Sequence, residues 1–143
     1  MQVKLKKLDK RAILPTRGST AAAGLDLYAL DGVTVGVGET VLVHTGIALA
    51  IPEGYAGFIY ARSGIATKRG LAPANKVGVI DADYRGEIMV ALHNHSATEQ
   101  AVEAGERIAQ LVVAPFLSVE LAVVEALDET ERASGGFGST GKN

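Results

Sequence analysis

The chain has 143 residues, 48% of them apolar, which suits one domain with enough material for a core. The net charge of −2 gives no reason to expect nucleic acid or an anionic membrane as a partner. No cysteine is present, so disulfides and thiol catalysis are excluded. Charges near the N-terminus, together with apolar runs too short to span a bilayer, predict a soluble, cytoplasmic protein.

Gly and Pro punctuate the chain at short intervals, and runs rich in Val, Ile and Leu lie between them. Short strands at such spacing predict an all-β sandwich or barrel. One short helical turn is expected within residues 64–68, and residues 120–131 can be read either as a helix or, from 119 to 124, as a strand. In chain order, the expected strands are 3–8, 33–37, 41–43, 47–51, 55–61, 77–80, 87–92, 107–113 and 119–124.

The composition changes near Asp128, after which apolar residues nearly vanish and Gly and Ser dominate. Such a segment buries too little surface to offset its ordering entropy, so we expect a domain of residues 1–127 and a flexible arm of residues 128–143. The arm contains G-x-G-x-x-G and most of a G-x-x-x-x-G-K-[ST] phosphate loop. Both motifs bind phosphate through a helix that follows directly, and none is expected here.

Two stretches in the first half look unusual for plain β-structure. Residues 23–28 place a lone carboxylate, Asp26, in an otherwise apolar run, where it is either a turn cap or a functional group. Residues 58–64 form a strand that ends in Arg62, Ser63 and Gly64. A guanidinium, a hydroxyl and amides near a glycine can together bind phosphate, although an ordinary arginine at a strand end is the competing interpretation.

Two further stretches lie in the second half. Residues 75–87 bring Asp81, Asp83 and Glu87 after an apolar strand, which by itself leaves a metal site, an acid/base pair and a solvated turn open. Residues 105–111 place the neutral amide of Gln110 in a strand, where it could orient a water without competing for its proton. His93 and His95 would share a strand face, but no carboxylate pattern supports a metal site with His44, so structural roles are favoured.

Taken together and in order, these stretches resemble the five motifs of the trimeric dUTPase family. The matching residues are 23–28, 62–64, 78–87, 105–110 and 132–141, so the resemblance covers nearly the whole chain. It implies a distorted jelly roll that assembles as a homotrimer with active sites shared between subunits. It also implies Mg²⁺-dependent hydrolysis of dUTP to dUMP and pyrophosphate, which limits uracil incorporation into DNA and supplies dUMP for dTMP synthesis.

The resemblance assigns three catalytic roles. Asp81 matches the aspartate that activates the water attacking the α-phosphorus, a contribution of about 10²–10⁴-fold. Asp26 matches the carboxylate that holds waters around Mg²⁺, while the triphosphate itself chelates the ion. Gln110 matches the amide that contacts the α-phosphate and the catalytic water.

The resemblance also assigns substrate contacts. Uracil would be bound by Asn75 and the backbone around Gly78, and Tyr84 would pack under the deoxyribose. Arg132 in the arm would reach the γ-phosphate, and Phe137 would stack on uracil with ~1–3 kcal/mol. The remaining phosphate contacts would come from Arg62, Ser63, Gly64, Gly138 and Ser139.

Two other functions compete with this interpretation. A dCTP deaminase, alone or combined with dUTPase activity, shares the jelly roll and the trimer but needs a carboxylate over the pyrimidine C4, and Glu87 is the only nearby candidate. A non-catalytic trimeric β-protein could bind nucleotide without the water-activating base that Asp81 would supply.

Overall fold

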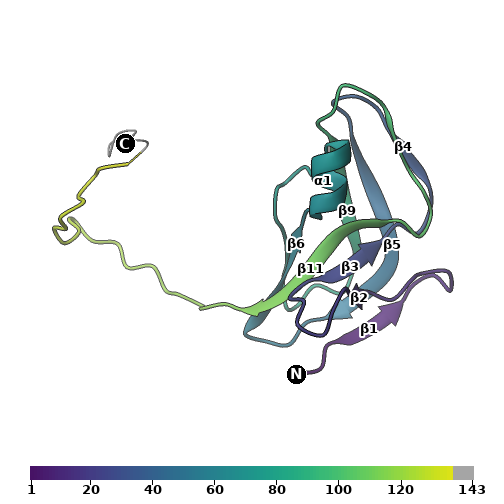
Figure 1. Ribbon diagram of the computed structural model, residues 1–143. Coiled ribbons are helices and arrows are strands. Elements are labelled where there is room, and N and C mark those ends of the chain that lie inside the picture. Colours follow the sequence, from purple (N-terminus) through teal and green to yellow (C-terminus); the bar gives the residue numbers. More distant parts are fainter. Residues whose placement is uncertain (137–143) are drawn as a thin grey trace.

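The computed structural model describes residues 1–136 as a nearly all-β protein with one short helix (Figure 1). The elements are β1 (Lys4–Lys7), β2 (Thr16–Arg17), β3 (Leu25–Tyr28), β4 (Val33–Val35), β5 (Thr40–Ala50), β6 (Tyr55–Tyr60), α1 (Ser63–Arg69), β7 (Leu71–Pro73), β8 (Gly78–Ile80), β9 (Glu87–Asn94), β10 (Gln100–Val102) and β11 (Arg107–Pro115).

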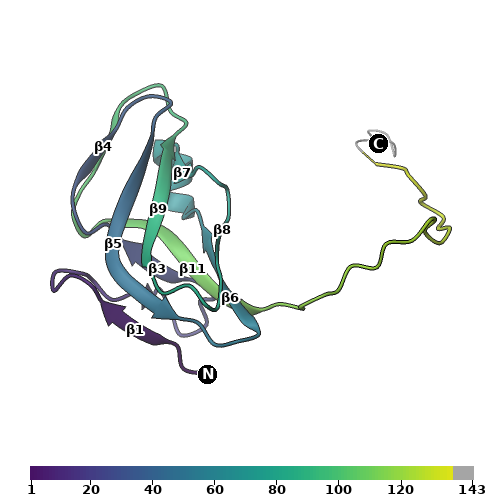
Figure 2. The ribbon, with the colours of Figure 1, turned by 180° about the vertical axis from the view of Figure 1, so that it is seen from behind.

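Two antiparallel sheets and a ribbon make up the fold. One sheet has four strands in the order β1-β5-β9-β7, and the other has five in the order β2-β3-β11-β6-β8. β10 and β4 form a separate ribbon, visible at the edge of the molecule when it is seen from either side (Figures 1 and 2). Neighbours in the sheets are far apart in sequence, as in a jelly roll, and the predicted fold class is confirmed.

The core lies between the sheets and is formed by the side chains that point inward from alternate positions of the strands. Every second residue of β9 is buried from Ile88 to Asn94, because successive side chains of a strand point to opposite faces. Leu27, Ile108 and Leu111 of the facing sheet are buried as well. Each such aliphatic side chain contributes about 1.5–3 kcal/mol on full burial.

One long strand replaces the two strands predicted at 41–43 and 47–51. β5 runs without a break through a β-bulge, where its register with β9 shifts between His44 and Ala48. Gly46 in the bulge has φ 71°, and a Cβ atom there would lie 2.9 Å from the Cβ of Ala12. Glycine therefore satisfies both the backbone conformation and the close packing at this point.

The predicted turn at 64–68 is confirmed as helix α1, which follows β6 directly. The helix ends at Gly70, which adopts φ 67° and donates its amide to the carbonyl of Ala66 at 3.1 Å. Arg69 in the last turn pairs with Glu106, so the helix is tied to the loop that precedes β11.

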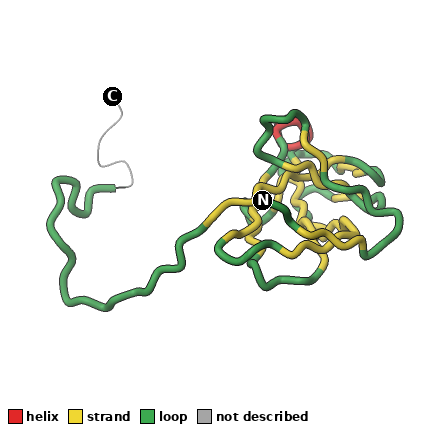
Figure 3. The backbone as a smooth tube through the Cα atoms, turned by 90° about the horizontal axis from the view of Figure 1, so that it is seen from below, coloured by secondary structure: helices red, strands yellow, loops and turns green. Residues whose placement is uncertain are grey.

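The strand predicted at 119–124 is wrong, and so is the alternative helix at 120–131. Residues 116–136 leave the end of β11 without a helix or strand and extend away from the sheets (Figures 1 and 3). The sequence also gave no separate indication of β2, β7 or β10, which have only two or three residues each. Within residues 1–136, no helix has the length and apolar character needed to cross a membrane.

Candidate active site

A cluster of charged side chains surrounds Asp26 on β3. Arg62 donates its Nε to one carboxylate oxygen of Asp26 at 2.6 Å, and Arg107 donates from its terminal nitrogen to the other at 3.3 Å. The side chain of Asp26 is only 13% exposed, so both ion pairs are partly shielded from water. The cluster joins the beginning of β11 to the residue that precedes α1, and it carries a net positive charge suited to phosphate.

Gln110 lies beside this cluster in the middle of β11. It pairs in register with Asp26 of β3 and with Tyr60 of β6. Its side-chain amide donates to the carbonyl of Ala61 at 2.9 Å. The other end of the amide lies over Gly24, where an added Cβ would collide with the oxygen and lie 3.2 Å from the amide carbon. The glycine of the first motif thus makes room for the amide of the fourth.

Ser63 and Gly64 begin helix α1 and are exposed, immediately after the arginine that binds Asp26. An added Cβ on Gly64 would meet nothing within 4 Å, so open space lies over this residue. The structure therefore brings together the sequence-predicted residues Asp26, Arg62, Ser63, Gly64 and Gln110, where β3 and β11 pass the start of α1.

A second group of predicted residues lines a pocket of about 250 Å³. Asn75, Gly78, Asp81 and Tyr84 all contribute to its wall. The turn before β8 places Lys76 at φ 64°, and Gly78 lies so close to Asn75 that an added Cβ would be 3.4 Å from its amide nitrogen. A side-chain amide and exposed backbone at a pocket wall can bind the polar edge of a base.

Asp81 is the first residue after β8 and is exposed to solvent. It lines both this pocket and a second hollow of about 560 Å³, which Asp83 and Glu53 also line. Residues 81–84 turn tightly, with the amide of Tyr84 donating to the carbonyl of Asp81 at 3.2 Å. Asp83 therefore lines only the second hollow, although a fully extended chain would have kept the two carboxylates on one face.

The two groups occupy different ends of the strands within one chain. Gln110 lies opposite Tyr60 of β6, whereas Ile80, the neighbour of Asp81, lies opposite Gly57 of the same strand. Three positions along a strand correspond to roughly 10 Å. One chain thus does not bring Asp81 next to the Asp26 cluster.

Arg132, predicted to bind phosphate, belongs to the segment of residues 116–136, which extends away from the sheets (Figure 1). Its Nε donates to the carbonyl of Gly135 at 2.9 Å, which closes a small local turn. Phe137, Gly138 and Ser139 lie outside the described residues.

The three histidines lie in two places among the described residues. His93 and His95 place their rings 4.4 Å apart, edge to face, while His44 contacts Glu87 instead. The pKa of His95 is lowered by desolvation and by the charges of Lys76 and His93. In the part of the chain that the structure describes, no three His, Asp or Glu side chains are grouped to hold an ion.

Sequence reasoning missed three residues at these sites. Arg107 was part of the fourth stretch but received no role, although a charged residue opening an apolar strand was a usable signal. Leu42 and Met89 line the pocket from β5 and β9. Their apolar side chains look like ordinary strand residues, and only the tertiary fold brings them there.

The fold and the site define a jelly-roll protein with a cationic cluster and a pocket large enough for a base. The chain belongs to the dUTPase family, whose model matches residues 10–141. Deoxyuridine 5'-triphosphate nucleotidohydrolase from Nautilia profundicola is 47% identical over 142 residues, covering 99% of this chain and 100% of the relative. The protein of that name from Syntrophotalea carbinolica is 51% identical over 141 residues, covering 97% of this chain and 96% of the relative.

Solved structures agree with this assignment. The dUTPase of Staphylococcus bacteriophage 80alpha in complex with dUpNHpp is 31% identical, with a TM-score of 0.92 and 99% coverage of both chains.

Proposed function

We propose that this protein is a dUTP diphosphatase, an enzyme that hydrolyses dUTP to dUMP and pyrophosphate. Its membership of the dUTPase family over residues 10–141 is the observation that carries this conclusion. The relatives at 47% and 51% identity are named for that activity, and the match covers almost their whole length. In the cytoplasm, the reaction would limit uracil incorporation into DNA and supply dUMP for dTMP synthesis.

The proposed mechanism begins at the pocket. Asn75 and the backbone at Gly78 would bind the uracil edge, and Tyr84 would pack under the deoxyribose, where a ribose 2′-hydroxyl would collide. Support comes from their shared position on one pocket wall. Asp81, exposed at the rim of that pocket, would take a proton from the water that attacks the α-phosphorus, and pyrophosphate would leave.

The Asp26 cluster would bind the phosphates. Arg62, Ser63 and Gly64 offer a guanidinium, a hydroxyl and open backbone at the start of α1. Gln110 would contact the α-phosphate and the attacking water through its amide. Donors fixed before the substrate arrives stabilise developing charge without reorganising during the reaction, and the contact of Gln110 with Ala61 supports such fixation.

Magnesium enters this proposal with the substrate. Both oxygens of Asp26 already accept hydrogen bonds from arginines, which suits contacts to metal-bound waters better than direct ligation. The donor set therefore fits Mg²⁺ chelated by a triphosphate, since this ion keeps several of its waters in proteins. When bound, Mg²⁺ would neutralise phosphate charge, and Asp26 would orient its waters.

We propose that the complete site forms in a homotrimer, in which subunits share active sites. The separation of Asp81 from the Asp26 cluster along β6 supports this, because a second subunit could bring the missing group. The pocket residues of one subunit would face the phosphate cluster of its neighbour. We infer no nucleic-acid or membrane partner.

The arm, residues 128–143, would close over the bound substrate as a segment separate from the domain of residues 1–127. Arg132 would contact the γ-phosphate, Phe137 would stack on uracil, and Gly138 and Ser139 would bind phosphate oxygens. Among the described residues, the Nε of Arg132 donates to the carbonyl of Gly135 within a local turn, and the side chain is exposed, which supports a role in reaching phosphate.

The deciding experiment measures pyrophosphate release from dUTP, dTTP, dCTP and UTP side by side with Mg²⁺. The proposal requires strong preference for dUTP. Ammonia release from dCTP would instead identify a deaminase, and nucleotide binding without any pyrophosphate release would identify a non-catalytic binding protein.

A further inference from the structure

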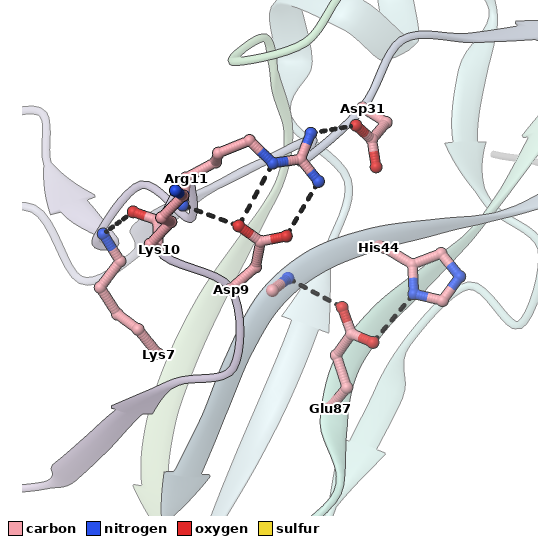
Figure 4. A network of polar contacts seen from close by, with 8 residues as sticks. Lys7, Asp9, Lys10, Arg11, Asp31, His44 and Glu87 are labelled. Carbon is pink, nitrogen blue, oxygen red and sulfur yellow. Dashed lines mark hydrogen bonds and ion pairs between the residues drawn. The ribbon is translucent and has the colours of Figure 1, made fainter.

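Glu87 is the first residue of β9 and follows directly on the loop of residues 81–86 that carries Asp81 and Tyr84. Its carboxylate is 22% exposed and has two donors on β5 (Figure 4). The amide of Gly46 donates to one oxygen at 2.8 Å, and Nδ1 of His44 donates to the other at 2.9 Å. Both oxygens are therefore held by the neighbouring strand.

The bulge in β5 makes this contact possible. The register of β5 with β9 shifts between His44 and Ala48, which frees the amide of Gly46 from the regular ladder. The carbonyl of Gly46 in turn accepts the amide of Leu8 at 2.8 Å. The loop after Leu8 is itself held by the ion pairs of Arg11 with Asp9 and Asp31 (Figure 4). The partner of Glu87 is thus a fixed part of the fold.

The backbone of Glu87 faces the catalytic loop. Its carbonyl accepts a hydrogen bond from the hydroxyl of Tyr84 at 3.0 Å. The ring of Tyr84 lies against Gly86, where an added Cβ would be 2.5 Å from the ring carbon that bears the hydroxyl. Arg85 donates to the carbonyls of Ala82 at 2.6 Å and Tyr84 at 2.9 Å, which closes the turn. The loop is therefore internally braced, and Glu87 links it to β5.

The electrostatics agree with this geometry. Partial burial raises the pKa of Glu87, but the hydrogen bonds from His44 and from the amides of Gly46 and Thr45 outweigh it and hold the pKa below its ordinary value. The carboxylate is ionised near neutral pH and remains a strong acceptor.

We propose that Glu87 is a positioning residue for dUTP hydrolysis, because its carboxylate fixes Tyr84 and the loop of Asp81 against the bulge of β5. This role rests on the proposed dUTP diphosphatase activity. Glu87 borders the pocket, yet both its oxygens face donors on β5, so it acts on the substrate through Tyr84. Glu87 thereby determines the position of the Tyr84 ring on which the sugar would pack, and hence the preference for deoxyribose.

The test compares Glu87→Ala, which removes both contacts, with Glu87→Gln, which keeps an acceptor for Gly46 and an amide beside His44. Glu39→Ala is the matched control, because the carboxylate of Glu39 also accepts a glycine amide, that of Gly36 at 3.1 Å, away from the loop. Two quantities are measured for each variant: kcat/KM for dUTP relative to UTP, and hydrogen exchange of the amides in residues 81–87.

Glu87→Ala should lower the dUTP/UTP ratio by roughly tenfold and speed exchange in the loop, as expected for loss of a charge-assisted contact. Glu87→Gln should restore most of both, and Glu39→Ala should leave both unchanged. Parental selectivity and parental exchange in Glu87→Ala would overturn the proposal. If that variant does not fold, His44→Ala, which removes one contact, should shift both readouts in the same direction.

Failure of the proposed activity is separable from failure of this inference. A parent protein that releases no pyrophosphate from dUTP refutes the activity, whereas the exchange comparison still shows whether Glu87 holds the loop. Unchanged exchange in both Glu87→Ala and His44→Ala refutes the anchoring role in an active enzyme.

Discussion

Replacing Gly24 with alanine should damage catalysis while sparing the fold. The new Cβ would collide with the side-chain oxygen of Gln110 and lie 3.2 and 3.3 Å from two of its carbons. Gly24 does not have a positive φ, so alanine suits its backbone. The flexible end of Gln110 is what must move, and its 2.9 Å hydrogen bond to Ala61 would break.

The expected magnitudes differ between the two properties. Losing one neutral hydrogen bond costs about 0.5–1.5 kcal/mol in the free energy of unfolding. Losing a preorganised donor at a reacting phosphate costs roughly 10²-fold in kcat. Thermal unfolding and pyrophosphate release from dUTP, measured on the same preparation, should therefore show a small loss of stability beside a large loss of rate.

The matched control lies in the same loop, between β2 and β3. Gly18→Ala adds a Cβ that meets nothing within 4 Å, so both stability and rate should stay at the parental values. In a Gln110→Ala background, Gly24→Ala should have little further effect on kcat, because the side-chain amide that it displaces is gone and only the 3.3 Å approach to the Cβ of residue 110 is left. A parental rate in Gly24→Ala, or additive losses in the double variant, would refute the reasoning.

Four further outcomes are expected. Asp81→Asn should lower kcat by at least ~10²-fold with substrate binding largely kept, and near-parental turnover would exclude Asp81 as the base. Tyr84→Ala should relax the preference for dUTP over UTP in competition assays; equal discrimination would assign sugar choice to the backbone. Refolding an Asp81→Asn chain together with a chain deleted after Asp128 should restore some activity. A protein that light scattering shows to be monomeric, and that is nevertheless fully active, would contradict shared sites. Because the folded pKa of Glu87 is lowered, its stabilisation is present above its unfolded pKa and lost as pH falls through the folded value. Melting temperatures should thus fall more in the parent than in Glu87→Gln between about pH 5 and pH 3, and parallel curves would count against the His44 contact.

Most of the longer strands could be predicted from the sequence, because each buries apolar side chains. The motifs that lie on these strands or directly after them could be recognised as well. A run rich in apolar residues identified the strand at 87–92, and the helical turn expected within 64–68 corresponds to the helix at 63–69. The site residues could be found because a polar side chain within an apolar strand is costly to bury unless it has a partner or a function. The resemblance to a family gave them roles that the residues alone left open.

The remaining features depend on tertiary contacts. Gly46 looked like a break between two strands, but its positive φ creates a bulge that continues one strand. Arg107 received no role from the sequence, because only the fold places it beside Asp26. Short strands such as β10 lacked a pattern long enough to recognise, since only pairing with β4 defines them.

The wrong strand prediction at 119–124 is informative about assembly. Leu117, Val119, Leu121 and Val123 alternate as on one face of a strand, yet they are 70–100% exposed. An apolar row of this kind is typical of a strand face that packs against another surface. No residue in the described part of the chain buries these side chains. Monomeric soluble proteins rarely expose a continuous apolar row of this kind, which supports coverage by another subunit.

The energy at stake is comparable with the stability of a whole domain. Burying four such side chains would contribute about 6–12 kcal/mol as an upper bound, against roughly 5–15 kcal/mol for typical folding. Assembly would then contribute an amount comparable with the net free energy of unfolding of a typical domain. If the homotrimer proposed above both covers this row and joins Asp81 of one subunit to the Asp26 cluster of another, a chain without partners should lose stability and activity together. Its melting temperature should therefore depend on protein concentration, as mass action requires.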